Sequence, residues 1–126
     1  MPLSSVSAAF SVLAVELDSG PVFLADRSGA LGLDRLTGAL LGELSVSADG
    51  ASVRLEAQAL PAEAAGQWWA NRDAAVLEVS PAMGSVYDGR IVFDGLIQNE
   101  PTEQAGVLSL TLAPRQHRIV ALPDAG

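Results

Sequence analysis

The sequence predicts an all-β domain, a small antiparallel barrel or sandwich of about seven strands with one short helix. The clearest observation is the stretch 107–113, where Val, Ser, Thr and Ala alternate with three leucines. A period of two places one set of side chains on each face of a sheet. Turn-forming segments separate this stretch from two earlier apolar runs, at 75–80 and 90–98. Three strands joined in this way predict an antiparallel meander.

The same alternation predicts which faces of the meander are buried. Leu108, Leu110 and Leu112 share one face of its last strand. Strict alternation puts Ile91, Phe93 and Gly95 on one face of the strand before it. We expect both of these faces to be buried. The sequence leaves open whether the sheet closes into a barrel or stacks as a sandwich.

Two hairpins are predicted before the meander. Residues 6–17 and 22–25 are apolar runs separated by Asp-Ser-Gly-Pro, a typical turn sequence. Residues 43–59 contain two alternating runs around Ala-Asp-Gly-Ala, and Asp-Gly between alternating runs is a strong hairpin signal. In the second of these runs we expect Val53 and Leu55 to point inward.

Two segments are predicted to contain no strand. Residues 26–42 hold four glycines among leucines, which favours a structured loop containing a turn of helix capped by Asp34. Residues 60–70 begin Leu-Pro-Ala-Glu-Ala-Ala, which predicts a short helix with Pro61 at its first position. Gly66 limits the length of that helix.

Length and composition indicate one domain over residues 1–126, in which 115–126 adds a strand or docks as a C-terminal arm. Hydrophobic residues make up 49% of the chain but aromatic residues only 5%, so the core is built from Leu, Val and Ala. No apolar run approaches the length of a membrane span, and the N-terminal residues lack the basic start of a signal peptide. We therefore expect synthesis and folding in a cytoplasm.

The charge and the residue types exclude several classes of function. Fifteen acidic residues against seven basic ones give a formal charge of −8, which repels phosphates and anionic lipid. Neither nucleic acid nor a membrane is therefore an expected partner. The absence of cysteine removes disulfides, thiol catalysis and thiolate metal sites.

The remaining routes to chemistry are weak. His117 is the one histidine, so a histidine-based triad or multi-histidine metal site is not available in one chain. Asp88 with Asp94, and Glu100 with Glu103, are the carboxylate pairs to consider, but a glycosidase cleft also needs aromatic platforms that this chain lacks. We expect no enzymatic activity, no metal and no cofactor.

Trp68 and Trp69 are the most informative aromatic residues. Adjacent side chains cannot point the same way on a helix or a strand. We expect one indole to anchor the short helix to the sheet. The other either packs within the core and loops or is partly exposed for contact with a partner or a sugar ring.

The stretch from Trp69 to Leu112 resembles the early β domain of tail-hub and tail-tip proteins from tailed bacteriophages and phage-derived gene transfer agents. The matching runs are Val-Leu-Glu-Val at 76–79, the strand at 88–97, and Val-Leu-Ser-Leu-Thr-Leu at 107–112. The resemblance covers about a third of the chain, and hub proteins normally carry further domains. It implies a structural tail or baseplate protein located in the virion tail and assembled in the host cytoplasm. Its implied partners are other tail proteins and copies of itself.

Two segments outside the meander, 29–42 and 119–126, are too apolar to lie in water. Their apolar residues need burial, either within the domain or against a partner. The predicted interface residues are Trp68, Trp69, Leu31, Leu33, Leu36, Leu40, Leu41, Ile119, Val120 and Leu122. The alternative function class is a soluble β-sandwich binding module for a carbohydrate or protein ligand.

Overall fold

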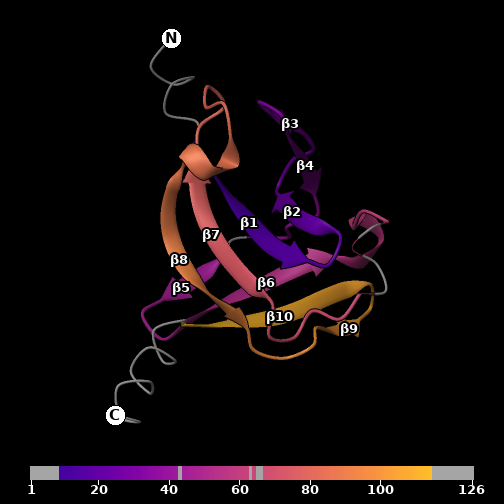
Figure 1. Ribbon diagram of the computed structural model, residues 1–126. Helices are drawn as coiled ribbons and strands as arrows, with labels where there is room; N and C mark the ends of the chain where they lie inside the picture. The colour runs from indigo at the N-terminus through magenta and orange to yellow at the C-terminus, as the bar shows by residue number, and fades with distance from the viewer. Residues whose placement is uncertain (1–8, 43, 63, 65–66, 115–126) are drawn as a thin grey trace.

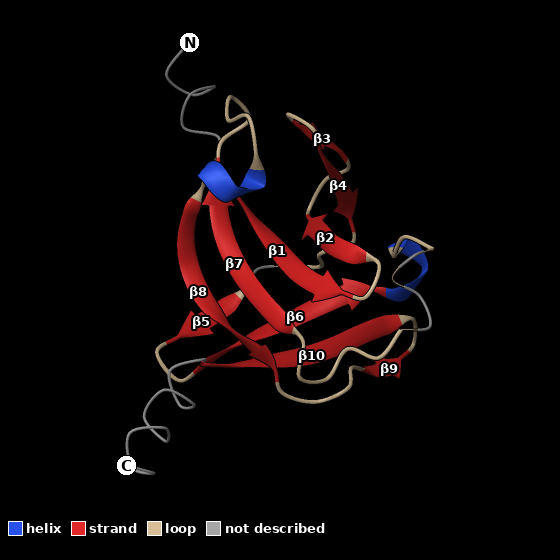
Figure 2. Cartoon of the chain, viewed as in Figure 1, coloured by secondary structure: helices blue, strands red, loops and turns tan. Residues whose placement is uncertain are grey.

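The computed structural model describes residues 9–42, 44–62, 64 and 67–114, and more than half of these lie in strands (Figures 1 and 2). Two 3-10 helices of three residues interrupt them, η1 (Ala57–Ala59) and η2 (Val86–Asp88). The strands are β1 (Phe10–Leu17), β2 (Gly20–Ala25), β3 (Gly29–Leu31), β4 (Asp34–Gly38), β5 (Ser45–Ser47), β6 (Gly50–Glu56), β7 (Asp73–Val79), β8 (Arg90–Ile97), β9 (Thr102–Gln104) and β10 (Val107–Pro114).

The strands form one hydrogen-bonded sheet in the order β3-β4-β2-β1-β7-β8-β10-β6-β5, with β9 added to β10. All pairings are antiparallel except that between β2 and β4. The sheet turns back on itself beyond β8, so β6 and β10 cross beneath β1 and β7 (Figure 1). In the described residues the two end strands, β3 and β5, do not pair. The predicted all-β class is confirmed, and the arrangement is sandwich-like and not a closed barrel.

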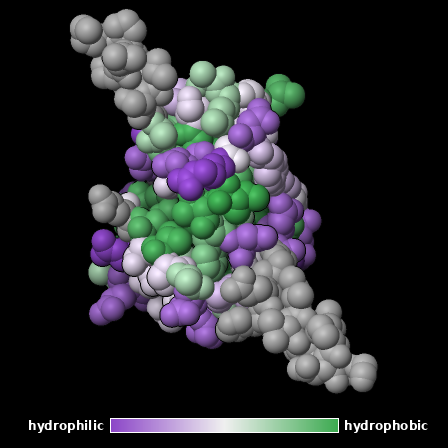
Figure 3. Space-filling view, turned by 90° about the vertical axis from the view of Figure 1, so that its left-hand side faces the viewer, coloured by the Kyte–Doolittle hydropathy of each residue, from purple (hydrophilic) through white to green (hydrophobic). Residues whose placement is uncertain are grey.

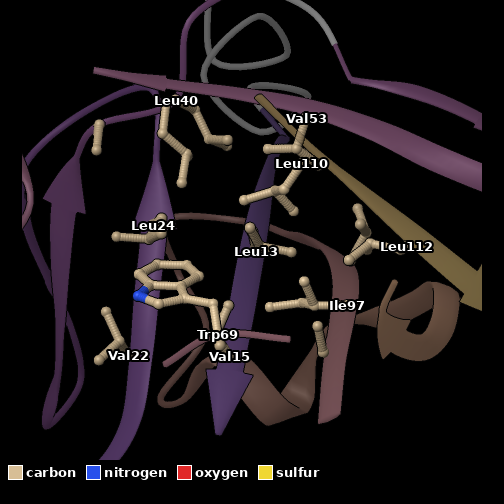
Figure 4. Close-up of a cluster of buried hydrophobic side chains, with 14 of the residues drawn as sticks. Leu13, Val15, Val22, Leu24, Leu40, Val53, Trp69, Ile97, Leu110 and Leu112 are labelled. Atoms are coloured by element: carbon tan, nitrogen blue, oxygen red, sulfur yellow. The ribbon is translucent and has the colours of Figure 1, made fainter. Parts of the chain in front are cut away.

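The larger core fills the space between the two layers (Figure 4). One layer contributes Leu13, Val15 and Leu24, and the other contributes Val53 and Leu112. Most of these side chains are leucine or valine, as the low aromatic content predicts.

A smaller core lies on the opposite face of β1. It includes Val12 and Phe23, and β3, β4 and η2 cover it through Leu31, Leu36 and Val86. Val12 and Leu13 are neighbours in sequence, point to opposite faces, and are both 0% exposed. β1 is therefore buried on both sides, which explains why its sequence is an apolar run.

Both predicted hairpins and the meander are confirmed. β1 pairs with β2, and β5 pairs with β6, each antiparallel. The meander is β7, β8 and β10, in that order across the sheet. Val53 and Leu55 are buried while Arg54 and Glu56 between and after them are exposed.

The prediction of a loop with a helical turn at 26–42 was wrong. β3 and β4 form a hairpin there, with Leu31 opposite Asp34. Gly32 has a φ of 63°, a left-handed conformation that glycine accepts at little cost and that makes the two-residue turn possible. Asp34 caps no helix of its own. Its Oδ2 accepts hydrogen bonds from the Ser85 hydroxyl at 2.8 Å and the Val86 N–H at 2.9 Å, which ties β4 to η2.

The predicted helix at 60–70 is also not observed in the described residues of that segment, which are 60–62, 64 and 67–70. The nearby helical turn, η1, ends before Leu60, whose backbone is extended with φ −66° and ψ 142°. Leu60 precedes Pro61, and the proline ring disfavours the α conformation in the residue before it.

A β-bulge explains the incorrect assignment of Ile91. β7 residues Val76 and Leu77 pair with Phe93 and Ile91, so Val92 is an extra residue in β8. The bulge moves Ile91 off the face of Phe93, because a one-residue shift reverses the side-chain direction. Phe93 is 8% exposed, as predicted, whereas Ile91 is 60% exposed.

The face assigned to β10 is confirmed and generates the first prediction. Leu110 and Leu112 are buried, and Leu108 packs partly buried against the same core. We expect Leu110→Ala to lower the free energy of unfolding by roughly 2–5 kcal/mol, the usual cost of a cavity in a core. Urea denaturation measures this, with exposed Ser109→Ala as the control. A loss below about 1 kcal/mol for Leu110→Ala would contradict the assigned packing.

The second prediction concerns the junction of β8 with β10. A Cβ added at Gly95 would collide with the carbonyl oxygen of Ala113 on the paired strand. We expect Gly95→Ala to destabilise the fold by about 1–3 kcal/mol, since one backbone must move. Gly84→Ala is the matched control, because its Cβ would meet nothing closer than Asp88 Oδ2 at 3.8 Å. Equal denaturation midpoints for the two variants would refute the close approach.

Candidate assembly surface

The part of the chain that the structure describes offers few clusters of side chains that could bind a metal or carry out catalysis. It contains no group of three or more His, Cys, Asp or Glu side chains arranged to hold a metal ion. Nor does it contain a helix long and apolar enough to span a bilayer. His117 lies outside the described residues. The exposed apolar side chains are therefore the remaining candidates for a functional surface.

The two tryptophans point in opposite directions. Trp69 is 3% exposed and its indole packs among Val22 and Leu24 of β2 and Val15 of β1 (Figure 4). Its Nε1–H donates to the Ala64 carbonyl at 3.3 Å. The sequence prediction that one indole anchors its segment is confirmed, and Trp68 is the indole that is exposed.

Glu100 holds the backbone on which both tryptophans sit. Its Oε1 accepts hydrogen bonds from the backbone N–H of Trp69 at 2.8 Å and of Ala70 at 3.0 Å. Glu100 is one of the carboxylates considered for catalysis, and in the structure its side chain fixes the backbone of Trp69 and Ala70.

Trp68 is 63% exposed and borders a shallow depression of about 460 Å³. We call this the Trp68 surface. Its apolar lining includes Leu60, Pro101 and Leu108, and its acidic lining is Glu100 and Glu103. An exposed indole beside smaller apolar groups, with polar groups at the rim, is typical of a protein contact site.

A polar network fixes the position of the Trp68 backbone. Arg72 Nε donates to the Trp68 carbonyl at 2.9 Å, and its NH1 forms an ion pair with Asp18 at 2.6 Å. Gln67 Oε1 accepts from the Asp18 N–H at 3.1 Å, and Gln67 Nε2 donates to Ser19 Oγ at 3.0 Å. The turn between β1 and β2 therefore supports the segment that carries Trp68.

The other predicted interface residues are placed differently. Leu31 and Leu36 belong to the smaller core, and Leu40 belongs to the larger one. Leu41 is partly buried, and Leu33 is fully exposed at the tip of the β3–β4 turn. Ile119, Val120 and Leu122 lie outside the described residues. Partner contact at these positions stays a prediction, and among the members that the structure describes Trp68 and Leu33 have exposed side chains.

Sequence reasoning missed four exposed apolar side chains. Within the described ranges, the exposed large hydrophobic residues are Leu33, Val46, Trp68, Tyr87, Ile91 and Val92. The bulge that exposes Ile91 and Val92 has no signature in the sequence. Tyr87 packs edge-to-face on Phe23, and its hydroxyl donates to Glu16 at 3.2 Å.

The network around Trp68 generates the third prediction. Hydrogen bonding and then charge attraction from Arg72 lower the pKa of the Asp18 carboxyl. We expect Arg72→Gln to return this pKa upward towards its ordinary value. In the unchanged protein the ion pair stabilises the fold above the unfolded carboxyl pKa, and this contribution is lost as pH falls through the lowered folded pKa. An NMR titration of the Asp18 carboxyl measures the shift, and Arg27→Gln, which removes the partner of Asp26, is the control. An Asp18 pKa that is the same in both variants would contradict this account.

Comparison with known proteins identifies a fold relative. Neither a protein-family profile nor a curated protein matches the sequence. Among solved structures, a chain from the virion of a native gene transfer agent particle is similar, with a TM-score of 0.54 and 16% sequence identity. The match covers 84% of this chain and 40% of that one, so this chain spans less than half the length of its structural neighbour. The β fold described above is therefore similar to part of a chain in a gene transfer agent virion.

Proposed function

We propose that this protein is a structural component of a phage-like virion, and more specifically of its tail or baseplate. It would act by assembling with neighbouring tail proteins and with copies of itself. The observation that carries the proposal is the likeness over 84% of the chain to a gene transfer agent virion chain. The sequence resemblance to tail-hub and tail-tip proteins supports the finer assignment.

The Trp68 surface suits such a role. Large aromatic side chains at the centre of an interface contribute most to binding, provided that smaller contacts exclude water around them. Leu60, Pro101 and Leu108 would supply those contacts. Glu100 and Glu103 favour a partner surface with basic groups, because unlike charges across an interface guide association.

The fourth prediction tests whether the Trp68 surface mediates assembly. Trp68→Ala should weaken association with the tail partner by about 2 kcal/mol or more, roughly 30-fold in Kd, while the free chain stays equally stable. Sedimentation velocity and pull-down with particle proteins measure association, and denaturation measures stability. Ile91→Ala removes a comparably exposed apolar side chain elsewhere and is the matched control. Equal association of the two variants would exclude this surface as the contact site.

A separate experiment tests whether the protein is a virion component and whether it lies in the tail. Particles purified from a producing bacterium should contain the chain, detected by mass spectrometry, and an antibody label should mark the tail under electron microscopy. If the antibody marks capsids and not tails, the protein is a virion component but the tail assignment is wrong. Absence from the particles would refute both.

A carbohydrate-binding module is the second candidate, because the exposed Trp68 indole beside Glu100 and Glu103 could stack on a sugar ring and bond its hydroxyls. A glycan array separates the candidates. Binding that is lost in Trp68→Ala and kept in Ile91→Ala would favour the module, and an array without hits would favour assembly.

A further inference from the structure

The β3–β4 hairpin carries an exposed apolar side chain beside an exposed positive charge. Leu33 in its turn is fully exposed, and Arg35, two residues later, is exposed as well. Both residues line one shallow depression of about 220 Å³, so they lie close together on the surface. Burial of such a leucine against a partner removes apolar surface from water and favours association. We call Leu33 and Arg35 the hairpin tip.

Contacts with the segment around η2 fix the position of the hairpin tip. Gly32 lies so close to Gly84 that an added Cβ would collide with the Gly84 carbonyl oxygen. The Asp34 carboxylate accepts hydrogen bonds from the Ser85 hydroxyl and the Val86 N–H, so it is engaged with η2. A segment held in this way loses little further entropy when it binds. The hairpin tip is therefore ordered before it meets a partner.

The structure shows no ion pair between Arg35 and another described residue. The arginines that do form such pairs are Arg27 with Asp26, Arg72 with Asp18, and Arg90 with Glu78. Arg54 also shows none, but it lies in the middle of β6, whereas Arg35 adjoins the exposed turn. A guanidinium is always charged and binds both carboxylates and aromatic faces. Arg35 can therefore pair with a partner without giving up an ion pair that the structure shows.

The Trp68 surface offers the groups that a leucine and a guanidinium bind. Its apolar lining includes Leu60 and Pro101, which can remove a leucine side chain from water. Its indole is 63% exposed, and an aromatic face attracts a guanidinium. The exposed residue Glu103 of β9 lines the same depression and provides a carboxylate. The apolar, aromatic and acidic groups of this surface match the two side chains of the hairpin tip.

The side of β8 and β5 is another apolar surface, but it offers no such match. Figure 3 looks onto this side and shows hydrophobic surface gathered in its middle with hydrophilic residues around it. The arginines that line the depression there are already in ion pairs, Arg27 with Asp26 and Arg90 with Glu78. Because these charges are satisfied within the chain, they select no partner. Ile91 of β8, which is 60% exposed, therefore supplies a control.

The hairpin tip and the Trp68 surface lie on different parts of the molecule. Neither Leu33 nor Arg35 lines the Trp68 depression of its own chain. Figure 1 shows the β3–β4 hairpin and β9 towards opposite ends of the molecule. A contact between the hairpin tip and the Trp68 surface therefore requires two copies of the chain.

We infer that the hairpin tip of one copy docks on the Trp68 surface of the next copy. Leu33 packs against the apolar lining, and Arg35 lies against the Trp68 indole and the Glu103 carboxylate. The inference rests on the proposed function, since it names a second copy of the chain as the partner of this surface. A contact between two different patches is head-to-tail, and it repeats into a closed ring or a filament.

Exchange of opposite charges in the full chain tests the contact. Arg35→Glu and Glu103→Arg each place like charges against each other, so each variant should self-associate at least about tenfold more weakly than the unchanged chain. An equimolar mixture of the two variants pairs opposite charges again and should associate within about threefold of the unchanged chain. Arg54→Glu changes the net charge as Arg35→Glu does and is the matched control. Sedimentation equilibrium measures the dissociation constants, and denaturation verifies that the variants fold.

Each of three outcomes would overturn the contact. The first is an unchanged chain that stays monomeric up to about 1 mM. The second is an Arg35→Glu variant that associates as strongly as Arg54→Glu. The third is a mixture of Arg35→Glu and Glu103→Arg that associates no better than either variant alone.

Substitution of the exposed leucine provides a test that does not depend on charge. Leu33→Ser should weaken self-association by roughly fivefold or more, because the contact loses its apolar anchor. The stability of the free chain should not change, because Leu33 is fully exposed. Ile91→Ser removes an exposed apolar side chain elsewhere and should associate as the unchanged chain does. Equal association of the two serine variants would refute the docking of the hairpin tip.

The content of purified particles separates this contact from the proposed function. A chain that is present in the particles but fails the charge-exchange test keeps its virion role and loses the contact. A chain that passes the test but is absent from the particles keeps the contact and loses the virion role. Particle proteins that bind Arg35→Glu and the unchanged chain equally, but not Trp68→Ala, would assign the Trp68 surface to a different protein.

Discussion

The double burial of β1 is the constraint on which the rest of the structure depends. Leu13 and Val15 point into the larger core while Val12 and Ala14 point into the smaller one, and all four are buried. A strand buried on both faces needs a cover on each side. β6 and β10 provide one cover, and the β3–β4 hairpin with η2 provides the other. The two cores share a strand, so we expect them to unfold in one cooperative transition.

The regular strands could be predicted from the sequence because their side chains alternate between water and a core. Leu110 and Leu112 illustrate this, since their pattern alone identified the buried face. Elements that depend on partners distant in the sequence could not be predicted. Leu31 and Leu36 looked like part of a loop because their burial needs Phe23 and Leu77, which lie on other strands. The exposure of Ile91 depends on a bulge, and the acceptor role of Glu100 depends on a segment about thirty residues earlier.

The junction of β8 with β10 explains how one continuous sheet becomes two layers. Within the described residues, three residue pairs join these strands, whereas β10 pairs with β6 over six. Gly95 lets the backbones approach closely at this junction, and Gly50 does the same against Leu112 at the start of β6. Glycine is costly in a strand because it contributes no side chain to the packing, and here it permits a close approach between backbones that a Cβ would prevent.

The opposite orientations of Trp68 and Trp69 have a consequence for the energetics of binding. The buried indole and the Arg72–Asp18 network hold the backbone of the exposed indole in place before any partner arrives. The entropy of ordering this segment is therefore lost during folding and not during association. A contact surface prepared in this way binds more tightly for the same buried area than one that becomes ordered on contact. The same arrangement means that a substitution of the buried Trp69 would also loosen the backbone that carries the exposed Trp68.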